Sequence, residues 1–424
     1  MVPANILQQV ITWNMADLEI FQNLCPFVYN ANTKFKNFED FRGKSNLGST
    51  VNYETPPRFV GQESLVVNFQ SIQQNARSLT VNKQENVSYA GTAEQIVFNN
   101  LEEYTVRLGA SAMAELASRV ERDVATLAET IPYRFFGNGT SPIASAQQLS
   151  QMLSNMRAYS MAPGSIDGYL DSQAIPAIVG AMQNQFTIDR NNENARSWMV
   201  GNWDGAEWYV SNQLPIHFAG NVGNLAQTLT VISTNDPTGN NITQITFSGA
   251  STSDADAIKQ FDSMQFVKVS GQRLLTWLQY VGHGPTSLAV QMSVTADAGS
   301  DSSGHVTVNI FPPLCATAGS ANQNIQFNVT AGMQVQVLPD HKCGMAIADK
   351  ALYVAMPPLP NTMPFPSATA VDENTMVSVR LYYGVIPFQN VYGWTRDIIW
   401  GKDAVPQNTM KIVFPLTAAG GLGA

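Results

Sequence analysis

The sequence has 424 residues, of which 44% are hydrophobic, so it is long enough to bury the cores of several domains. Only 13% of the residues are charged, against about 25% in a typical soluble protein, and the formal net charge is -9. Tight binding of nucleic acid needs clustered Lys and Arg, and the absence of any basic run disfavours that class of protein. The weakly charged surface suits contact with other protein.

The cysteines and the hydropathy pattern exclude further classes of protein. Cys25, Cys315 and Cys343 lie far apart and form neither a zinc-binding pattern nor a disulfide framework, so we expect a reducing compartment. The first twenty residues lack the basic start and apolar run of a secretory signal, and no stretch of about eighteen apolar residues occurs. We expect neither secretion nor membrane insertion.

The first predicted element is a short amphipathic helix that ends before Pro26 and forms an N-terminal arm. Its apolar residues are Ile6, Val10, Leu18 and Phe21.

Gly43-Lys44-Ser45 has the sequence of the end of a phosphate-binding loop. Such a loop needs a glycine five positions before Gly43, but Phe38 stands there, and the residues that follow alternate as in a strand. We therefore interpret this stretch as a hinge, in which Gly43 and Gly48 permit the chain to swing.

Residues 49–91 contain alternating stretches such as "SLVVNF" and "SLTVNKQ" between polar turns, which predict a long hairpin. The strongest helical pattern follows in residues 99–131, where apolar residues recur every three or four positions up to Pro132. Asn99 or Asn100 can cap the start of this helix.

The charged residues of the long helix are interpreted as a solvated face, because their four-residue spacing matches surface ion pairs rather than acid-base chemistry. These pairs are Glu103 with Arg107, Glu115 with Arg119, and Arg119 with Asp123.

Two shorter helices are predicted within residues 145–161 and 172–186. From Leu225 to Leu338 the pattern changes to short strands such as "QTLTVI", "ITQITF" and "HVTVNI" between polar turns, which predicts a small barrel or sandwich. Helix-rich chain precedes this block, so it is interpreted as a domain inserted into a host fold. Such an insertion costs little when its two ends lie close together.

The histidines and cysteines do not predict an enzyme. His341 and Cys343 could share one face of a strand, as a Cys-His nucleophile pair requires, but no third group that would orient the histidine is evident. A structural strand end is favoured. His217, His283 and His305 lie singly, without metal-ligand spacing, and are interpreted as structural.

Other stretches that suggest ligand binding are also incomplete. Asp254 with Asp256, and Asp297 with Asp301, lack the ligand spacing and final glutamate of a calcium loop and are interpreted as solvated turns. The stretches "GNGTSP" and "GHGPTS" lack the third glycine of a dinucleotide-binding loop. We predict no catalytic residue, no cofactor and no metal.

Several segments, in this order, resemble a known family. "ASAMAELASRVERDVATLAE" is similar to the family's spine helix, and "GNWDGAEWYVSNQLPIHFAG" to its stretch ending in Leu-Pro before an insertion. "CGMAIADKALYVAMPPLP" and "SVRLYYGVIPF" are similar to the strands that follow the insertion. The chain thus resembles tailed-phage major capsid proteins of the Hong Kong 97-type fold, in particular the insertion-domain coat proteins of short-tailed Salmonella phages. The turn "STNDPTGNN" is shorter than the family's long loop.

The resemblance implies an α+β fold with an inserted small β-barrel. It implies these segments: an N-terminal arm (1–44), an extended hairpin or E-loop (45–92), the spine helix and peripheral domain (93–200), the first part of the axial domain (201–223), the inserted β-barrel domain (224–338), and the second part of the axial domain with the C-terminal strand (339–424).

The resemblance also implies a structural protein of the virion, without enzymatic activity. Coat subunits of the family assemble in the host bacterial cytoplasm, with a scaffolding protein, into a procapsid of pentamers and hexamers. The icosahedral head then encloses double-stranded DNA, and a portal protein and a decoration protein are further implied partners. Two alternatives stay open: the shell of a cargo-storing bacterial nanocompartment, and an enzyme with a β-sandwich accessory domain.

An acidic patch on the N-terminal helix of these coat proteins implies a site for the scaffold. In this sequence Glu19 is the closer match to that patch, and Asp17 is adjacent to it. We expect both carboxylates to be exposed and to form weak, salt-sensitive ion pairs that allow the scaffold to leave.

Overall fold

The computed structural model divides into two compact units. Unit 1 comprises Met1–Thr55, Ala76–Ala125 and Lys350–Ala404, and unit 2 comprises Pro56–Asn75, Thr126–Asp349 and Val405–Ala424. The structure describes residues 4–32, 50–55, 58–61, 69, 76–92, 94, 101–143, 145–159, 164–172, 174–175, 199–361, 366–372, 376–386 and 391–416.

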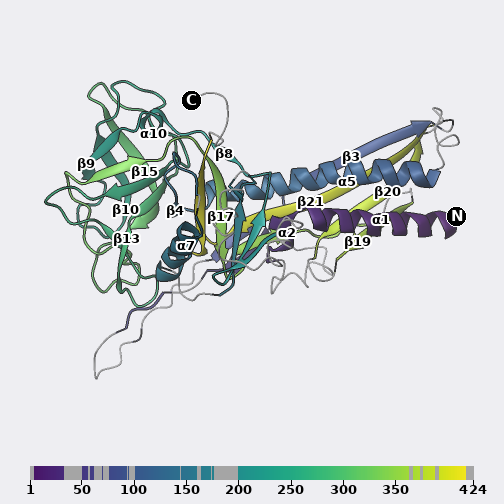
Figure 1. The fold of residues 1–424 in the computed structure, drawn as a ribbon, viewed down its shortest axis with the longest axis horizontal. Coiled ribbons are helices and arrows are strands. Elements are labelled where there is room, and N and C mark those ends of the chain that lie inside the picture. Colours follow the sequence, from purple (N-terminus) through teal and green to yellow (C-terminus); the bar gives the residue numbers. More distant parts are fainter. Residues whose placement is uncertain are drawn as a thin grey trace. The chain divides into compact units, whose positions relative to one another are not determined.

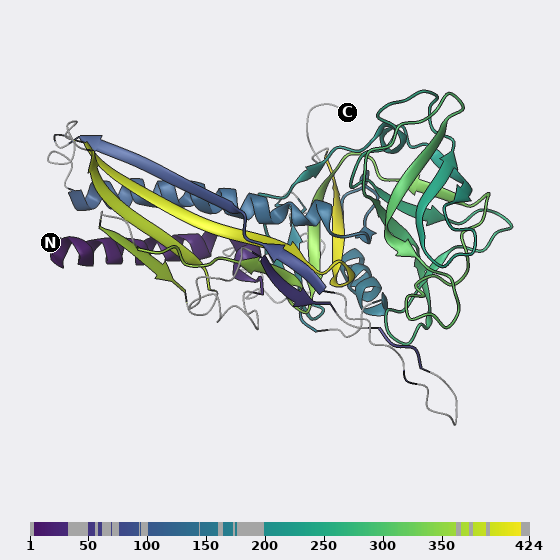
Figure 2. The same ribbon diagram turned by 180° about the vertical axis from the view of Figure 1, so that it is seen from behind.

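Unit 1 combines helices with an antiparallel sheet, and both views of the ribbon show α1 and α5 running alongside the long strands (Figures 1 and 2). The sheet has the order β18-β21-β20-β19, and β3 also pairs with β21. The elements of unit 1 are α1 (Ala4–Leu24), α2 (Pro26–Tyr29), β1 (Thr50–Glu54), β2 (Ala76–Thr80), β3 (Lys83–Thr92), α5 (Leu101–Ala125), β18 (Leu352–Ala355), β19 (Ser367–Val371), β20 (Ser378–Ile386) and β21 (Val391–Ala404).

The apolar stripe predicted from the sequence anchors α5 in unit 1. Leu116, Val120 and Val124 recur at four-residue spacing and are buried. On the same side of α5, the Cys25 thiol donates a hydrogen bond to the Ala117 carbonyl at 3.2 Å. The N-terminal segment ends its first helix before Pro26, as predicted, and then packs against α5.

The long helix does not run unbroken to Pro132 as predicted. The carbonyl of Thr126 accepts hydrogen bonds from the backbone N–H groups of both Glu129, at 3.1 Å, and Thr130, at 3.2 Å. Such a shared acceptor tightens the turn toward 3₁₀ geometry. The helix therefore ends at Ala125, and a separate short helix, α6 (Leu127–Thr130), belongs to unit 2.

The hairpin does not include β3, although the sequence pattern predicted that it would. β1 pairs with β2, from Thr50 opposite Thr80 to Glu54 opposite Ala76. β3 instead pairs with β21 over its whole length. The ladder with β21 pairs all ten residues of β3. The glycines of the predicted hinge, Gly43 and Gly48, lie outside the described residues.

Unit 2 contains a mixed sheet with the order β4-β22-β17-β5-β7-β6, in which β8 also pairs with β17. The predicted helix within residues 145–161 is present as α7, and most of the helix predicted within residues 172–186 lies outside the described residues. Apart from the barrel, the elements of unit 2 are α6, β4 (Phe135–Phe136), α7 (Ala146–Tyr159), β5 (Ile166–Leu170), β6 (Met199–Trp203), β7 (Ala206–Val210), β8 (Ile216–His217), α10 (Asn221–Asn224), β12 (Thr276–Leu278), β13 (Pro285–Ala289), β17 (His341–Ala348), η1 (Pro406–Asn408) and β22 (Thr409–Pro415).

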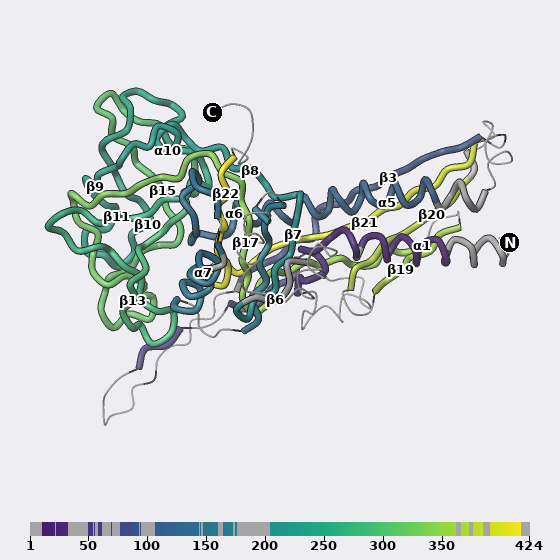
Figure 3. Tube along the Cα trace, viewed as in Figure 1, coloured from purple at the N-terminus to yellow at the C-terminus, as the bar shows by residue number. Residues whose placement is uncertain are grey.

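Between β8 and β17 in the sequence, the chain forms a closed barrel (Figure 3), which confirms the predicted small β-barrel. In β15, Val306, Val308 and Ile310 are buried while the residues between them are exposed, so strand alternation fills the barrel core. The barrel has the closed order β10-β15-β14-β11-β16-β9, made of β9 (Thr228–Thr234), β10 (Ile242–Ser248), β11 (Ser263–Val267), β14 (Gln291–Val294), β15 (His305–Leu314) and β16 (Gln334–Val337).

Candidate functional site

The two residues predicted to bind a scaffold lie on different sides of α1. Asp17 is 3% exposed, and its Oδ2 accepts a hydrogen bond from Arg396 Nε at 2.7 Å. Glu19 is exposed. Two residues correspond to about 200° around a helix, so these carboxylates point in nearly opposite directions. The expectation that both carboxylates are exposed is wrong for Asp17.

The buried face of α1 is polar as well as apolar. Asn14 lies one turn before Asp17, and its Nδ2 donates to the carbonyls of Ala368, at 2.8 Å, and Val379, at 3.1 Å. These hydrogen bonds attach α1 to β19 and β20 within unit 1. Burial raises the pKa of Asp17, and the positive charge of Arg396 offsets part of that rise.

Arg396 joins four elements of unit 1. Besides Asp17 of α1, it donates from Nη1 to the hydroxyl oxygen of Tyr89 on β3 at 3.2 Å. On α5, a Cβ added to Gly109 would lie 2.4 Å from Arg396 Nη2, so only glycine leaves room for the guanidinium. The adjacent charges Arg396 and Asp397, within the otherwise uncharged strand "VYGWTRDIIW", are a sequence signal that could have located the site.

Arg396 belongs to a set of four charged residues on β21, which we call the β21 charge set: Arg396, Asp397, Lys402 and Asp403. Each pairs with a different element of unit 1. The partners are Asp17 on α1 for Arg396, Arg380 on β20 for Asp397, Asp123 on α5 for Lys402, and Arg77 on β2 for Asp403.

The alternation of side chains between the two faces of β21 explains which elements supply these partners. Even-numbered residues such as Trp394 and Trp400 are buried on the face that meets the helices, and Arg396 and Lys402 share that face. Their partners accordingly lie on α1 and α5, whereas the two carboxylates of the set pair with arginines on β20 and β2. The set therefore fixes the helices and β2 to one long strand.

Asp123 was predicted to lie on a solvated face with Arg119, and this is wrong. It accepts hydrogen bonds from Trp400 Nε1 at 2.9 Å and from Lys83, and its Oδ1 lies 2.9 Å from Lys402 Nζ. Burial opposes ionisation of Asp123, but these donors hold its pKa below the usual value. The exposed pair of Arg119 with Glu115, at 2.8 Å, does match the prediction.

Asp403 anchors the hairpin of β1 and β2. Its Oδ2 accepts a hydrogen bond from the Tyr53 hydroxyl of β1 at 2.7 Å, and its Oδ1 accepts one from Arg77 Nη2 of β2 at 2.9 Å. Tyr53 also stacks on Tyr353, with ring centroids 4.3 Å apart. Both strands of the hairpin are thus attached to β21 at one carboxylate.

In unit 2, a histidine is held between two carboxylates. His217 Nδ1 lies 2.8 Å from Glu129 Oε1, and its Nε2 lies 2.8 Å from Asp262 Oδ1. Both ring nitrogens donate only in the protonated imidazolium, so this geometry favours the charged ring. Burial opposes the charge, but the two hydrogen bonds raise the pKa of His217 above its ordinary value. No sequence pattern indicated this cluster, because its members are far apart in the chain.

His341 and Cys343 do not form an activated nucleophile. His341 Nδ1 lies 2.7 Å from the Pro339 carbonyl, and burial is the main cause that lowers the pKa of His341 to about 3. Burial also raises the pKa of the Cys343 thiol to about 11, the opposite of what a thiolate nucleophile needs. The favoured interpretation of a structural strand agrees with this geometry.

The acidic residues suggested for calcium accept hydrogen bonds from side-chain and backbone groups of the protein. Asp254 accepts hydrogen bonds from the Asn221 side chain at 2.9 and 3.0 Å, and Asp297 accepts the backbone N–H of Gln260 at 2.7 Å. Asp301 accepts two backbone N–H groups of its own loop. Within the described ranges, no three His, Cys, Asp or Glu side chains converge as metal ligands.

Among the described residues, no helix is both long and apolar enough to cross a membrane.

Neither a protein-family model nor a curated protein matches the sequence. The chain is similar to solved phage capsids. The capsid of Ralstonia phage GP4 shares 8% identity with a TM-score of 0.43, over 92% of this chain and 88% of that one. The cyanophage Pam1 capsid shares 10% identity with a TM-score of 0.43, over 92% of this chain and 90% of that one.

A virus-like particle from Pyrococcus furiosus shares 6% identity with a TM-score of 0.39, over 95% of this chain and 97% of that one. Because each of these TM-scores is below 0.5, the function proposed below rests on the chain's own residues and topology.

Proposed function

We propose that the protein is the major coat subunit of a phage head. The order of elements along the chain supports this most: a helical arm, a hairpin, a 25-residue helix, a mixed sheet, and a closed barrel whose strands lie in sequence between the paired strands β8 and β17. This is the order that the resemblance of the sequence implies for a capsid protein of the Hong Kong 97-type fold. The neutral, high-pKa thiol of Cys343 gives an enzymatic alternative no support.

On this proposal, residues 1–44 are the arm, 45–92 the E-loop, 93–200 the spine helix and peripheral domain, 224–338 an inserted barrel domain, and 201–223 with 339–424 the axial domain. Subunits associate through heterologous contacts into pentamers and hexamers, which close into an icosahedron. A scaffolding protein directs assembly in the bacterial cytoplasm, and a portal protein and a decoration protein complete the head.

The surface chemistry suits this role. Ile11 and Met15 are exposed one turn apart on α1, and Ile216, Phe218 and Leu225 are exposed on and after β8. Exposed apolar groups on a surface that is otherwise weakly charged provide contacts between subunits. The net charge of -9 allows the shell to enclose DNA without binding it tightly.

The test is whether the purified protein assembles, in the presence and in the absence of a scaffolding protein. Negative-stain microscopy of sedimenting fractions should show closed particles or rings of five and six subunits, and native particles should contain nuclease-protected DNA. Particles filled with protein in place of DNA would favour the nanocompartment alternative. A stable monomer in every condition, scaffold included, would overturn the proposal.

A further inference from the structure

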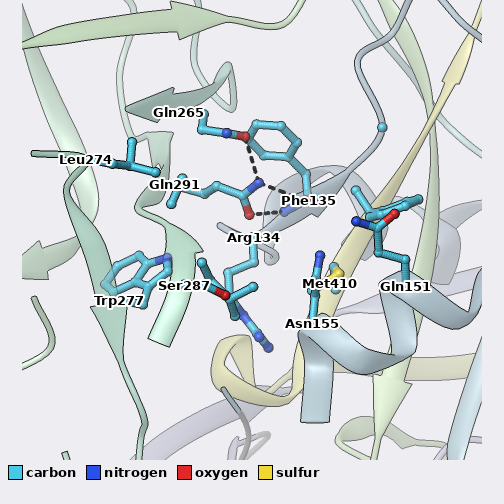
Figure 4. A pocket seen from close by; sticks show the side chains of 14 residues that line it. Arg134, Phe135, Gln151, Asn155, Gln265, Leu274, Trp277, Ser287, Gln291 and Met410 are labelled. Carbon is cyan, nitrogen blue, oxygen red and sulfur yellow. Dashed lines mark hydrogen bonds between the residues drawn. The ribbon is translucent and has the colours of Figure 1, made fainter. Parts of the chain in front are cut away.

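A cavity in unit 2 is part of none of the contacts described so far. It has a volume of about 440 Å³ and lies among β4, α7 and the barrel segments (Figure 4). This volume is in the range of small-molecule sites. Arg134 and Trp277 line it and are each 1% exposed, whereas Gln151 and Ser287 line it and are exposed. A solute can enter beside the two exposed residues and reach the buried ones.

Arg134 is a buried cation with unused donors. Its Nη2 donates to the carbonyls of Gln407, at 2.9 Å, and Thr409, at 3.4 Å. Its Nε and Nη1 have no hydrogen-bond partner in the part of the chain that the structure describes. The guanidinium carbon lies 4.2 Å from the centroid of the Tyr159 ring, a contact that stabilises the charge but leaves those N–H groups free. An unpaired buried donor destabilises the folded state, and does so more strongly when it is charged.

The other groups in the cavity add donors rather than a counter-charge. Trp277 Nε1 is a second buried donor without a partner among the described residues. The Gln291 amide is occupied, because its Oε1 accepts the Phe135 N–H at 2.9 Å and its Nε2 donates to Gln265 at 3.1 Å (Figure 4). None of the described residues that line the cavity is acidic. The cavity therefore offers positive charge and N–H groups to an acceptor from outside.

We propose that this cavity binds a carboxylate group. Its single guanidinium supplies one positive charge, which a carboxylate neutralises, whereas a doubly charged phosphate would leave buried negative charge in excess. Hydrogen bonds between a guanidinium and a carboxylate are charge-assisted and strong. The side chains of Leu274, Leu288 and Met410 also line the cavity and can contact the carbon chain of an aliphatic acid.

The carboxylate comes either from a free small acid or from an Asp or Glu side chain of a second copy of this chain. Both sources present the same group to Arg134. Binding of a free acid by the dissociated subunit requires no assembly, so this inference stands or falls separately from the proposed function.

The first experiment titrates the dissociated full-length protein with butanoate, an aliphatic acid with a single carboxylate, and follows its thermal unfolding and heat of binding. The midpoint of unfolding should rise with butanoate concentration and stay constant with inorganic phosphate at equal ionic strength. Arg134→Gln should abolish the rise. Arg157→Gln is the matched control, because Arg157 is on α7 but does not line the cavity, and this variant should respond as the parent does.

A second variant keeps the arginine and tests the site even if Arg134→Gln fails to fold. Asn155→Asp adds a carboxylate to the cavity lining. We expect the midpoint of unfolding to rise above that of the parent without added ligand, and the apparent affinity for butanoate to fall at least tenfold. A lower midpoint together with unchanged butanoate affinity would contradict the proposal.

Cryo-electron microscopy of assembled particles distinguishes the two sources. Density at Arg134 that is continuous with an acidic side chain of a neighbouring copy identifies that side chain as the ligand. Isolated density identifies a free acid. A cavity that holds only water in the particles, combined with no thermal response of the dissociated protein to butanoate, would overturn the proposal.

Discussion

Arg396 of β21 donates its Nε–H to Asp17 of α1 at 2.7 Å, although the two residues are 379 positions apart in the sequence and both are buried. A buried ion pair is weak evidence for net stability, because both ions lose their hydration. Removal of one partner is different, because it leaves the other charge buried and uncompensated. The N-terminal helix is thus bound to the sheet of unit 1 by an ion pair in which replacement of either residue is destabilising.

Asp17→Asn should lower the free energy of unfolding by about 3 kcal/mol, because it keeps the shape of the side chain and leaves the Arg396 charge unpaired. Urea unfolding followed by circular dichroism measures the loss. Glu19→Gln is the control, since Glu19 is exposed, and it should change stability by about 0.5 kcal/mol or less. Equal stability of the two variants would show that the buried pair is energetically unimportant.

Gly109→Ala should destabilise unit 1 even though alanine is the better helix former by about 1 kcal/mol. The new Cβ would lie 2.4 Å from Arg396 Nη2 and displace the guanidinium, at an expected cost of about 1 to 3 kcal/mol. Ser111→Ala, at an exposed position of the same helix, should be neutral or slightly stabilising. If Gly109→Ala gained stability as Ser111→Ala does, the close approach would not exist in solution.

The stability of unit 2 should depend on pH through His217. Its pKa is raised in the folded protein, so its contribution is fully present below the ordinary value of 6.5 and is lost as the pH rises through the folded value. His217→Gln should therefore flatten the fall in unfolding free energy that occurs as the pH rises above 6.5. Glu129, Asp262 and Lys411 face the ring and remain in the variant.

His341→Gln is the matched control for this experiment. The pKa of His341 is lowered to about 3, so its contribution is present above 6.5 and is lost as the pH falls toward the folded value. This variant should flatten the acid side of the profile and leave the alkaline side as in the parent. Alkaline slopes that are identical in all three proteins would contradict the role of His217.

Scaffold docking through the N-terminal helix stays a prediction, and the structure narrows it to Glu19. Glu19→Lys should reduce the incorporation of scaffold into particles at low salt, because a single exposed ion pair is worth about 0.2 to 1 kcal/mol and is screened by salt. Glu115→Lys, at another exposed acidic position of unit 1, is the control. Scaffold content of sedimented particles, measured by gel densitometry, gives the answer. Normal scaffold content in Glu19→Lys would place the docking site elsewhere.

The barrel should fold by itself, and the residues at the two ends of the barrel segment should add to its stability. A fragment of residues 224–338 contains every barrel strand, but it lacks Ala219 and Asp340, whose backbone and side chain join at 2.7 Å. Asn224 links the same two residues, since it donates to the Ala219 carbonyl and accepts the Asp340 N–H. A longer fragment of residues 219–340 retains these contacts. Both fragments should show protected amides in hydrogen exchange, and exchange should be slower in the longer one. Uniformly unprotected amides in both would mean that the barrel is not autonomous.

The elements that the sequence predicted well depend on local patterns. The stripe containing Leu116 and Val120 defines a helix within a few turns of chain, and the alternation of Val306, Val308 and Ile310 defines a strand that is buried on one face. A residue's neighbours in the sequence determine both periods, so helix and barrel could be predicted without knowledge of the fold. The division of residues 99–131 into α5 and α6 was missed, because one shared acceptor at Thr126 has no periodic signature.

The environment of the charged groups was decided only by the tertiary structure. By sequence, Asp17 and Glu19 are equivalent acids on one helix, and Asp123 is one of several charges at four-residue spacing. The side on which each lies depends on partners such as Arg396, hundreds of residues away. The folded chain determines the distances between these groups, and the cost of burying a charge depends on the partners that it finds there. The local sequence therefore predicts the periodicity of helices and strands. It does not predict which charged groups pair, which are protonated, or that donors of Arg134 are left without a partner.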